Sequence, residues 1–82
     1  MKQWYVYILL CRDDTLYTGI TDDPERRLQQ HNSGKGAKYT RGRGPVLLLH
    51  QESFPTKGEA LKREYEIKQL TRQQKLELIN RK

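Results

Sequence analysis

Residues 4–20 read WYVYILLCRDDTLYTGI, and this stretch decides the fold. Aromatic and β-branched residues dominate 4–11, which is typical of a strand, and 15–20 returns as a second strand after a turn at 12–14. Successive side chains of a strand point to opposite faces. The sequence therefore predicts a β-hairpin whose first strand carries Trp4, Val6, Ile8 and Leu10 on one face and Tyr5, Tyr7, Leu9 and Cys11 on the other.

The register of this hairpin decides whether Tyr7 and Tyr17 share a face, because a shift of one residue turns every side chain to the opposite face. A two-residue turn at 13–14 puts Tyr7 on the face opposite Tyr17. A three-residue loop at 12–14 pairs Tyr7 with Gly19 and places the two rings on one face, roughly 7–8 Å apart at the backbone. We expect the three-residue loop, with Gly19 leaving space opposite Tyr7 where a substrate backbone can approach.

Capping patterns predict three helices in the rest of the chain. Asp23-Pro24-Glu25 opens the first, and Gly34 is its expected stop. Thr56 and Thr71 each stand three residues before a Glu or Gln, which is the capping-box pattern, and they open a second helix to about residue 70 and a third after it.

A third strand is expected at 46–54, because four consecutive apolar residues begin it and predict burial at its beginning or centre. The order strand, strand, helix, strand, helix, helix then gives a small α+β domain. Its sheet is three-stranded and largely antiparallel, and helices flank it.

Length and composition limit the class of protein. The 82 residues allow one domain, 1–82, whose core buries roughly 60–65% of the surface of the unfolded chain. A single cysteine, Cys11, excludes an internal disulfide framework and fits a reducing compartment. Since neither a signal-peptide pattern nor an apolar run of membrane-spanning length is present, we expect a soluble cytoplasmic protein without membrane contact.

The net charge of +6 fits a polyanionic partner, because cations that neutralise phosphates release condensed counterions. Residues 26–43 carry six cations and no acidic residue. An aromatic among cations can stack on a base while the cations follow the backbone, although a solvated loop has the same composition. On the first interpretation, the residues that contact nucleic acid are Arg26, Lys35, Lys38, Tyr39, Arg41 and Arg43.

Four segments of the chain together resemble one family of nucleases. They read YVYIL at 5–9, LYTGIT at 16–21, PERRLQQHN at 24–32 and EALKRE at 59–64. Over nearly its whole length the chain resembles the GIY-YIG nuclease superfamily, most closely its small single-domain branch and the nuclease domain of structure-specific repair endonucleases. The triplets here are Tyr-Val-Tyr and Tyr-Thr-Gly, so the tyrosines are kept while scaffold positions differ.

The resemblance implies a metal-dependent endonuclease that hydrolyses DNA by attack of water, in repair or recombination. It implies that Tyr7 or Tyr17 activates the water while the other positions the water or the scissile phosphate, and the sequence does not assign the two roles. Arg27 would offer its planar guanidinium to phosphate oxygens, and His31, on the same helix face, would accept the proton. Gly19 is a scaffold position.

Glu64 is implied as the only protein ligand of one Mg²⁺ or Mn²⁺ ion, which also binds waters and the substrate phosphate and is held weakly without substrate. Larger members carry a DNA-recognition domain that we do not expect here, so a partner protein is expected to supply specificity. Two alternatives are a nucleic-acid-binding module that keeps the nuclease fold with little or no cleavage, and a structural interaction domain. His50, Phe54 and Tyr65 are interpreted as structural residues, the aromatics as core.

Overall fold

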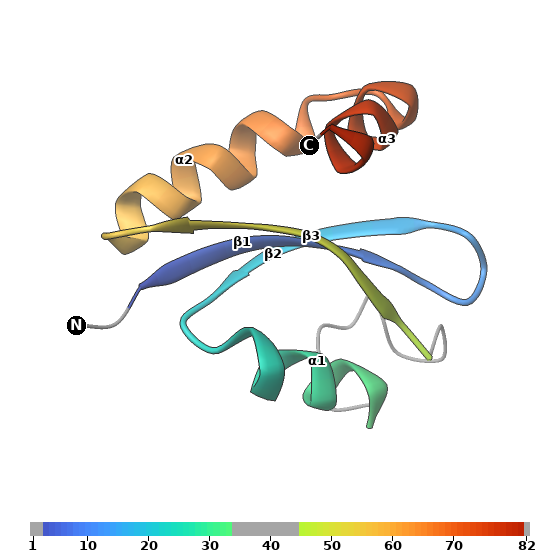
Figure 1. Cartoon of the computed structure of the whole chain (residues 1–82), viewed down its shortest axis with the longest axis horizontal. Helices are drawn as coiled ribbons and strands as arrows, with labels where there is room; N and C mark the ends of the chain where they lie inside the picture. The colour runs from blue at the N-terminus through green and yellow to red at the C-terminus, as the bar shows by residue number, and fades with distance from the viewer. Residues whose placement is uncertain (1–2, 34–44, 82) are drawn as a thin grey trace.

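The computed structural model describes residues 3–33 and 45–81, and these form an α+β arrangement (Figure 1). The described elements confirm the predicted order and the antiparallel sheet, whose strand order is β2-β1-β3. Among the described residues, no helix is both long and apolar enough to cross a membrane. The elements are β1 (Trp4–Leu10), β2 (Leu16–Thr21), α1 (Pro24–Asn32), β3 (Leu47–Phe54), α2 (Lys57–Lys68) and α3 (Arg72–Asn80).

The β1–β2 hairpin closes with the expected three-residue loop. The Cys11 N–H donates to the Thr15 carbonyl at 2.8 Å, and the Asp14 N–H donates to the Cys11 carbonyl at 2.9 Å. Asp14 has a φ of 69°, the left-handed conformation that ends this type of loop. The loop sets the predicted register, in which Tyr7 pairs with Gly19 and both tyrosine rings lie on one face.

Helices cover both faces of the sheet, and the central strand β1 is therefore buried on both sides (Figure 1). On one face, α2 and α3 pack over a core of Val6, Ile8, Ala60 and Ile67. On the other face, α1 lies against a second cluster formed by Tyr7, Leu9, Cys11 and Val46. The two predicted faces of the first strand are thus confirmed, and each face packs into one of the two hydrophobic clusters.

The three predicted caps all form. The Asp23 side chain accepts from the Arg26 N–H at 3.2 Å, and the Thr56 side chain accepts from the Glu59 N–H at 3.2 Å. At α3 the capping box is complete, because Thr71 and Gln74 exchange both side-chain-to-backbone hydrogen bonds. Of the predicted ends, α2 stops at Lys68, slightly early, while α1 stops at Asn32 and its expected stop, Gly34, lies outside the described residues.

The beginning of β3 is not buried, which corrects the prediction made from its apolar run. Leu47 is 59% exposed and Leu48 is 38% exposed, whereas Val46 just before them is buried. β3 is an edge strand of the sheet, and its register against β1 shifts between Ile8 and Leu9. A continuous apolar run indicates burial on both faces only for a strand inside a sheet, and the edge position removes that cover.

Candidate active site

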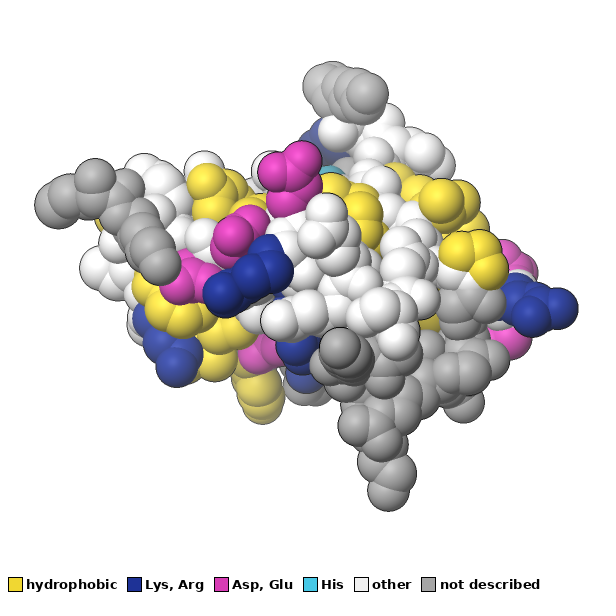
Figure 2. Space-filling model, turned by 90° about the horizontal axis from the view of Figure 1, so that it is seen from below, with side chains coloured by type: hydrophobic (Ala, Val, Ile, Leu, Met, Phe, Trp, Pro, Cys, Tyr) yellow, Lys and Arg dark blue, Asp and Glu magenta, His cyan; other side chains and the backbone are white. Residues whose placement is uncertain are grey.

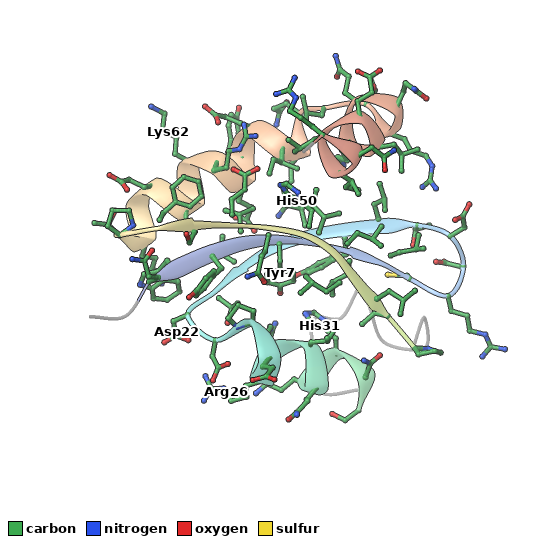
Figure 3. All side chains as sticks on the ribbon, in the orientation of Figure 1. Tyr7, Asp22, Arg26, His31, His50 and Lys62 are labelled. Carbon is green, nitrogen blue, oxygen red and sulfur yellow. The ribbon has the colours of Figure 1, made fainter. Side chains whose placement is uncertain are left out.

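α1 brings two of the predicted site residues to the underside of the sheet. The Asp23 cap and Pro24 fix where the helix begins, so residues four apart, Arg27 and His31, share the face toward the sheet. His31 is only 1% exposed, and it points from α1 toward the sheet while Tyr7 points from the sheet toward α1 (Figure 3). The sequence interpretation of a shared face is therefore confirmed.

The far end of α1 is held by a contact that the sequence analysis missed. Asn32 accepts the Val46 N–H at 2.6 Å through Oδ1 and donates from Nδ2 to the Val46 carbonyl at 3.4 Å. An amide side chain can satisfy the donor and the acceptor of one residue in this way. Because Asn32 follows His31 directly, this pairing fixes the position of the imidazole. No local signal in the sequence connects residues 32 and 46.

A buried hydrogen bond joins Tyr7 and His31. The Tyr7 hydroxyl lies 3.0 Å from His31 Nε2, and the two rings meet edge to face with centroids 5.9 Å apart. Burial first, and then the nearby charge of Arg27, lower the pKa of His31 from 6.5 to about 4. The ring is therefore neutral at pH 7. In the tautomer that carries its proton on Nδ1, Nε2 accepts the hydrogen bond from the Tyr7 hydroxyl.

The Tyr7 hydroxyl also has a shifted pKa. Burial raises its pKa above the ordinary value of 10.0, and the charges of Tyr17 and Glu64 act in the same direction. The Arg27 side chain opposes the rise, because it hydrogen-bonds the hydroxyl and its positive charge favours the phenolate. Tyr7 is thus a neutral phenol at pH 7 with a guanidinium and an imidazole beside it.

Tyr17 completes an aromatic cluster below the sheet. Its ring centroid lies 6.3 Å from that of Tyr7 and 5.3 Å from that of His31. The space opposite Tyr7 at Gly19 is not open, which corrects the expectation that a substrate backbone could enter there. A Cβ on Gly19 would stand 2.7 Å from the Tyr7 hydroxyl oxygen and 3.0 Å from Tyr17 Cε2. The absence of a side chain at Gly19 makes room for the tyrosine rings themselves.

Glu64 approaches from the other face of the sheet. Ala60 and Ile67 of α2 are fully buried, and Arg63 reaches Glu52 of β3 at 2.9 Å, so Glu64 occupies the opposite side of the helix, toward β2. Its side chain is 19% exposed and its carboxylate lies 3.4 Å from Lys68 Nζ. Its charge is the smallest of the contributions to the shifted pKa of Tyr7, so its electrostatic coupling to the cluster is weak.

The candidate metal site rests on Glu64 and not on a cluster of three or more ligands among the described residues. Over 3–33 and 45–81, no group of three or more His, Cys, Asp or Glu side chains is placed to hold a metal ion. A hard divalent cation that takes most of its ligands from water and phosphate needs only one or two protein carboxylates. The half-buried Glu64 fits that kind of site and does not fit a site built from protein ligands alone.

The predicted nucleic-acid residues are mostly outside the described part of the chain, which applies to Lys35, Lys38, Tyr39, Arg41 and Arg43. Arg26 is described, and its side chain is 66% exposed and points away from the sheet (Figure 3). It lies 3.8 Å from the Asp22 carboxylate, and basic and acidic side chains meet on this side of the molecule (Figure 2).

The structural interpretation of His50 is confirmed, and the sequence analysis missed its partners. His50 Nε2 lies 2.8 Å from Glu52, which also accepts two hydrogen bonds from Arg63. Burial alone would raise the pKa of Glu52, but the hydrogen bonds from Arg63 and His50 hold it below its ordinary value. Phe54 packs on the core as predicted. Tyr65 does not, because its side chain faces outward and is 69% exposed.

Residues 3–77 match the family of the GIY-YIG catalytic domain. The chain belongs to this family. It is 57% identical over 79 residues to a UPF0213 protein of Staphylococcus haemolyticus, with 96% of each chain covered. It is 62% identical over 78 residues to a UPF0213 protein of Clostridium perfringens, with 95% of this chain and 84% of the relative covered.

Two solved structures are similar in both sequence and fold. The solution NMR structure of a UPF0213 protein from Bacillus halodurans matches with a TM-score of 0.61 at 55% identity, over 94% of this chain and 82% of the other. That of a protein from E. faecalis matches with a TM-score of 0.63 at 49% identity, over 95% and 84%. The resemblance seen in the sequence is confirmed, and it places the chain in a nuclease family whose members are generally metal-dependent and whose domain implies nucleic-acid binding.

Proposed function

We propose that this GIY-YIG protein is a metal-dependent endonuclease that hydrolyses DNA phosphodiester bonds, in repair or recombination. The observation that carries the proposal is the buried hydrogen bond between the Tyr7 hydroxyl and His31 Nε2, beside the Arg27 side chain. A purely structural core seldom buries a phenol, an imidazole and a guanidinium together, because each polar group loses its water. Their grouping supports a chemical role.

The hydrogen bond offers a path for the proton of the attacking water. A phenolate at Tyr7 is disfavoured, since burial raises the pKa of the hydroxyl. A neutral phenol can instead accept a proton from water on its oxygen while it passes its own proton to His31, which is neutral at pH 7. Tyr7 would thus act as the relay and His31 as the final acceptor, with Tyr17 orienting the water or the phosphate.

Arg27 would bind the phosphate and also influence the pKa of His31. Its guanidinium, which now donates to Gln30 Oε1 at 2.9 Å, has the planar fork that suits two phosphate oxygens. Its charge contributes to the lowered pKa of His31. A bound phosphate would offset that charge, so the imidazole would accept a proton more readily when substrate is present than when it is absent.

Glu64 would hold one Mg²⁺ or Mn²⁺ ion from the β2 side of the sheet. When bound, such an ion supplies positive charge to the phosphate oxygens and lowers the pKa of a bound water. Glu64 contributes a half-buried carboxylate that Lys68 neutralises at 3.4 Å, so this ion pair must open first. We expect weak metal binding without DNA, because Glu64 is the one protein ligand that the proposal assigns to the ion.

A panel of labelled substrates tests the proposal. Intact, nicked, flapped and branched DNA, with RNA of matching sequence, are incubated with Mg²⁺ or Mn²⁺ and the wild type, Arg27→Ala or Glu64→Ala. Glu77→Ala and Arg81→Ala are matched controls, since they remove the same groups from exposed positions at the end of the chain. We expect metal-dependent cleavage of at least one DNA by the wild type and both controls, and its loss in the two site variants.

The same panel can overturn the proposal. If the wild type leaves every substrate intact across metals and concentrations but binds DNA, the protein is a nucleic-acid-binding module that keeps the nuclease fold. Binding that is weak and insensitive to salt would favour a structural interaction domain, because phosphate contacts weaken steeply as salt rises.

A further inference from the structure

Helix α2 carries different chemistry on its two sides. At 100° per residue, Ala60 and Ile67 form the stripe that faces the sheet, and both are fully buried. We call the side toward β3 the β3 flank, formed by Glu59, Arg63 and Glu66. We call the other side the β2 flank, formed by Lys57, Leu61, Glu64, Tyr65 and Lys68.

On the β3 flank, the positive charge of Arg63 is paired with acidic side chains. Arg63 makes two hydrogen bonds to Glu52 and a third to Glu66, at distances of 2.9 to 3.3 Å. With Phe54, Glu59 and Lys62, these helix residues line a shallow cavity of about 360 Å³ in which both signs of charge are present. This flank has no excess positive charge to attract a polyanion.

The β2 flank exposes apolar and cationic groups beside the proposed metal ligand. Tyr65 is 69% exposed and Leu61 is 44% exposed, and they lie one helical turn apart. Lys57 Nζ stands 5.2 Å from the centre of the Trp4 ring, and the half-exposed Lys68 pairs with Glu64. Within α2, all of which is described, Glu64 is the only acidic residue on this flank.

The positive charge continues along α3 on the same side of the sheet. Arg72 and Lys75 line a cavity of about 190 Å³ together with Thr15 and Leu16, at the start of β2. Arg72 is half-exposed and lies 3.4 Å from Asp14 of the hairpin loop. Cations therefore follow the β2 side from the beginning of α2 to the first turn of α3, and Tyr65 and Leu61 stand among them.

We propose that the β2 flank binds an unpaired nucleotide of the substrate strand next to the cut, with Tyr65 stacking on its base and Lys68, Arg72 and Lys75 following the phosphates. Aromatic side chains stack on any base, while cations track the backbone without reading sequence. The bases of a continuous duplex are already stacked on one another and cannot reach Tyr65. The position of the cut beside Glu64 rests on the proposed function, whereas the binding surface rests on the exposed side chains of α2 and α3.

Binding in EDTA tests this surface without any cleavage. Fluorescence anisotropy measures the affinity of the wild type, Tyr65→Ala and Tyr65→Phe for a labelled duplex with a short single-stranded gap and for the intact duplex. Leu47→Ala is the matched control, because it truncates another exposed apolar side chain, on β3. We expect Tyr65→Ala to weaken binding of the gapped DNA by about 5-fold or more, with little change for the intact duplex. Tyr65→Phe and Leu47→Ala should bind as the wild type does.

A pair of lysine variants tests the charged part of the surface. Lys75→Gln should lower the slope of log affinity against log salt by about 1, the value for one lost phosphate contact, whereas Lys62→Gln on the other side of α2 should leave it unchanged. Thermal melting of every variant checks that the fold is intact.

The inference is overturned if the wild type fails to prefer the gapped DNA, or if folded Tyr65→Ala binds it as tightly as the wild type. These results are separable from the fate of the proposed function. Tyr65-dependent binding without cleavage by the wild type removes only the nuclease proposal, and cleavage with Tyr65-independent binding removes only this one.

Discussion

The imidazole of His31 sits where protonation is costly, because the ring is 1% exposed and Arg27 is close. This burial distinguishes it from an ordinary histidine at a helix end, which would stay in water and gain from its charge near the last carbonyls. Because its pKa is lowered, the ring is a weak base in the free protein, and in the proposed mechanism it accepts a proton when a bound phosphate offsets the charge of Arg27. The free-energy cost of protonating this buried ring should be visible in the stability of the protein.

We expect the free energy of unfolding to depend on pH through His31. Its pKa is about 4 in the folded state against 6.5 ordinarily, so between these values the unfolded chain binds more protons. Stability contributed by the neutral ring is present above pH 6.5 and is lost as pH falls toward 4, by up to about 3 kcal/mol. Urea unfolding of the wild type and His31→Gln across this range measures it. An equal pH dependence in both proteins would contradict the assignment.

Gly19 gives a second test at the residue scale. Because a Cβ there would stand 2.7 Å from the Tyr7 hydroxyl oxygen, Gly19→Ala should displace the ring and destabilise the fold by about 1–3 kcal/mol. The matched control is Gly58→Ala in α2, where nothing lies within 4 Å of the added atom. That change should stabilise the helix by about 0.5–1 kcal/mol, since alanine is the better helix former. Two variants of equal stability would argue against the tight contact at Gly19.

At the scale of elements, the sequence predicts those features that neighbouring residues determine. The starts of all three helices follow from neighbouring residues, and each is found where it was expected. The expected three-residue loop at 12–14 is also found, although the local sequence allowed a two-residue turn as well. Burial of β3 was mispredicted because it depends on strand order, which no local pattern records. The outward position of Tyr65 was missed for a similar reason, since the face that α2 turns to the sheet is set by its packing.

The capping box of α3 makes a quantitative prediction for an element. Thr71→Ala removes the hydroxyl that accepts the Gln74 N–H, and should lower the free energy of unfolding by about 0.5–2 kcal/mol. Gln73→Ala, at an exposed position of the same helix, should change it very little. Denaturant unfolding of the two variants compares them directly, and a similar loss in both would show that α3 does not depend on its cap.

At the scale of the molecule, the candidate site draws on both faces of the sheet. Tyr7, His31 and Arg27 gather below it, while Glu64 approaches from α2 above it, on the β2 side. The order of residues along the chain predicted the candidate site residues. The register of the β1–β2 hairpin then places Tyr7 and Tyr17 on one face of the sheet. The sequence could not show that His31 is buried against Tyr7, because that contact depends on how α1 docks, and Asn32 secures the docking through Val46.

The rate of DNA cleavage by Tyr7→Phe tests the central claim most directly. The variant keeps the ring over Gly19 and removes only the hydroxyl that meets His31, and Tyr5→Phe on the same strand is its control. Under single-turnover conditions with Mg²⁺, we expect the wild type and the control to cut at the same rate and Tyr7→Phe to cut at least about 100-fold more slowly, the contribution typical of a positioned proton-transfer group. Cleavage by Tyr7→Phe at the wild-type rate would contradict the account.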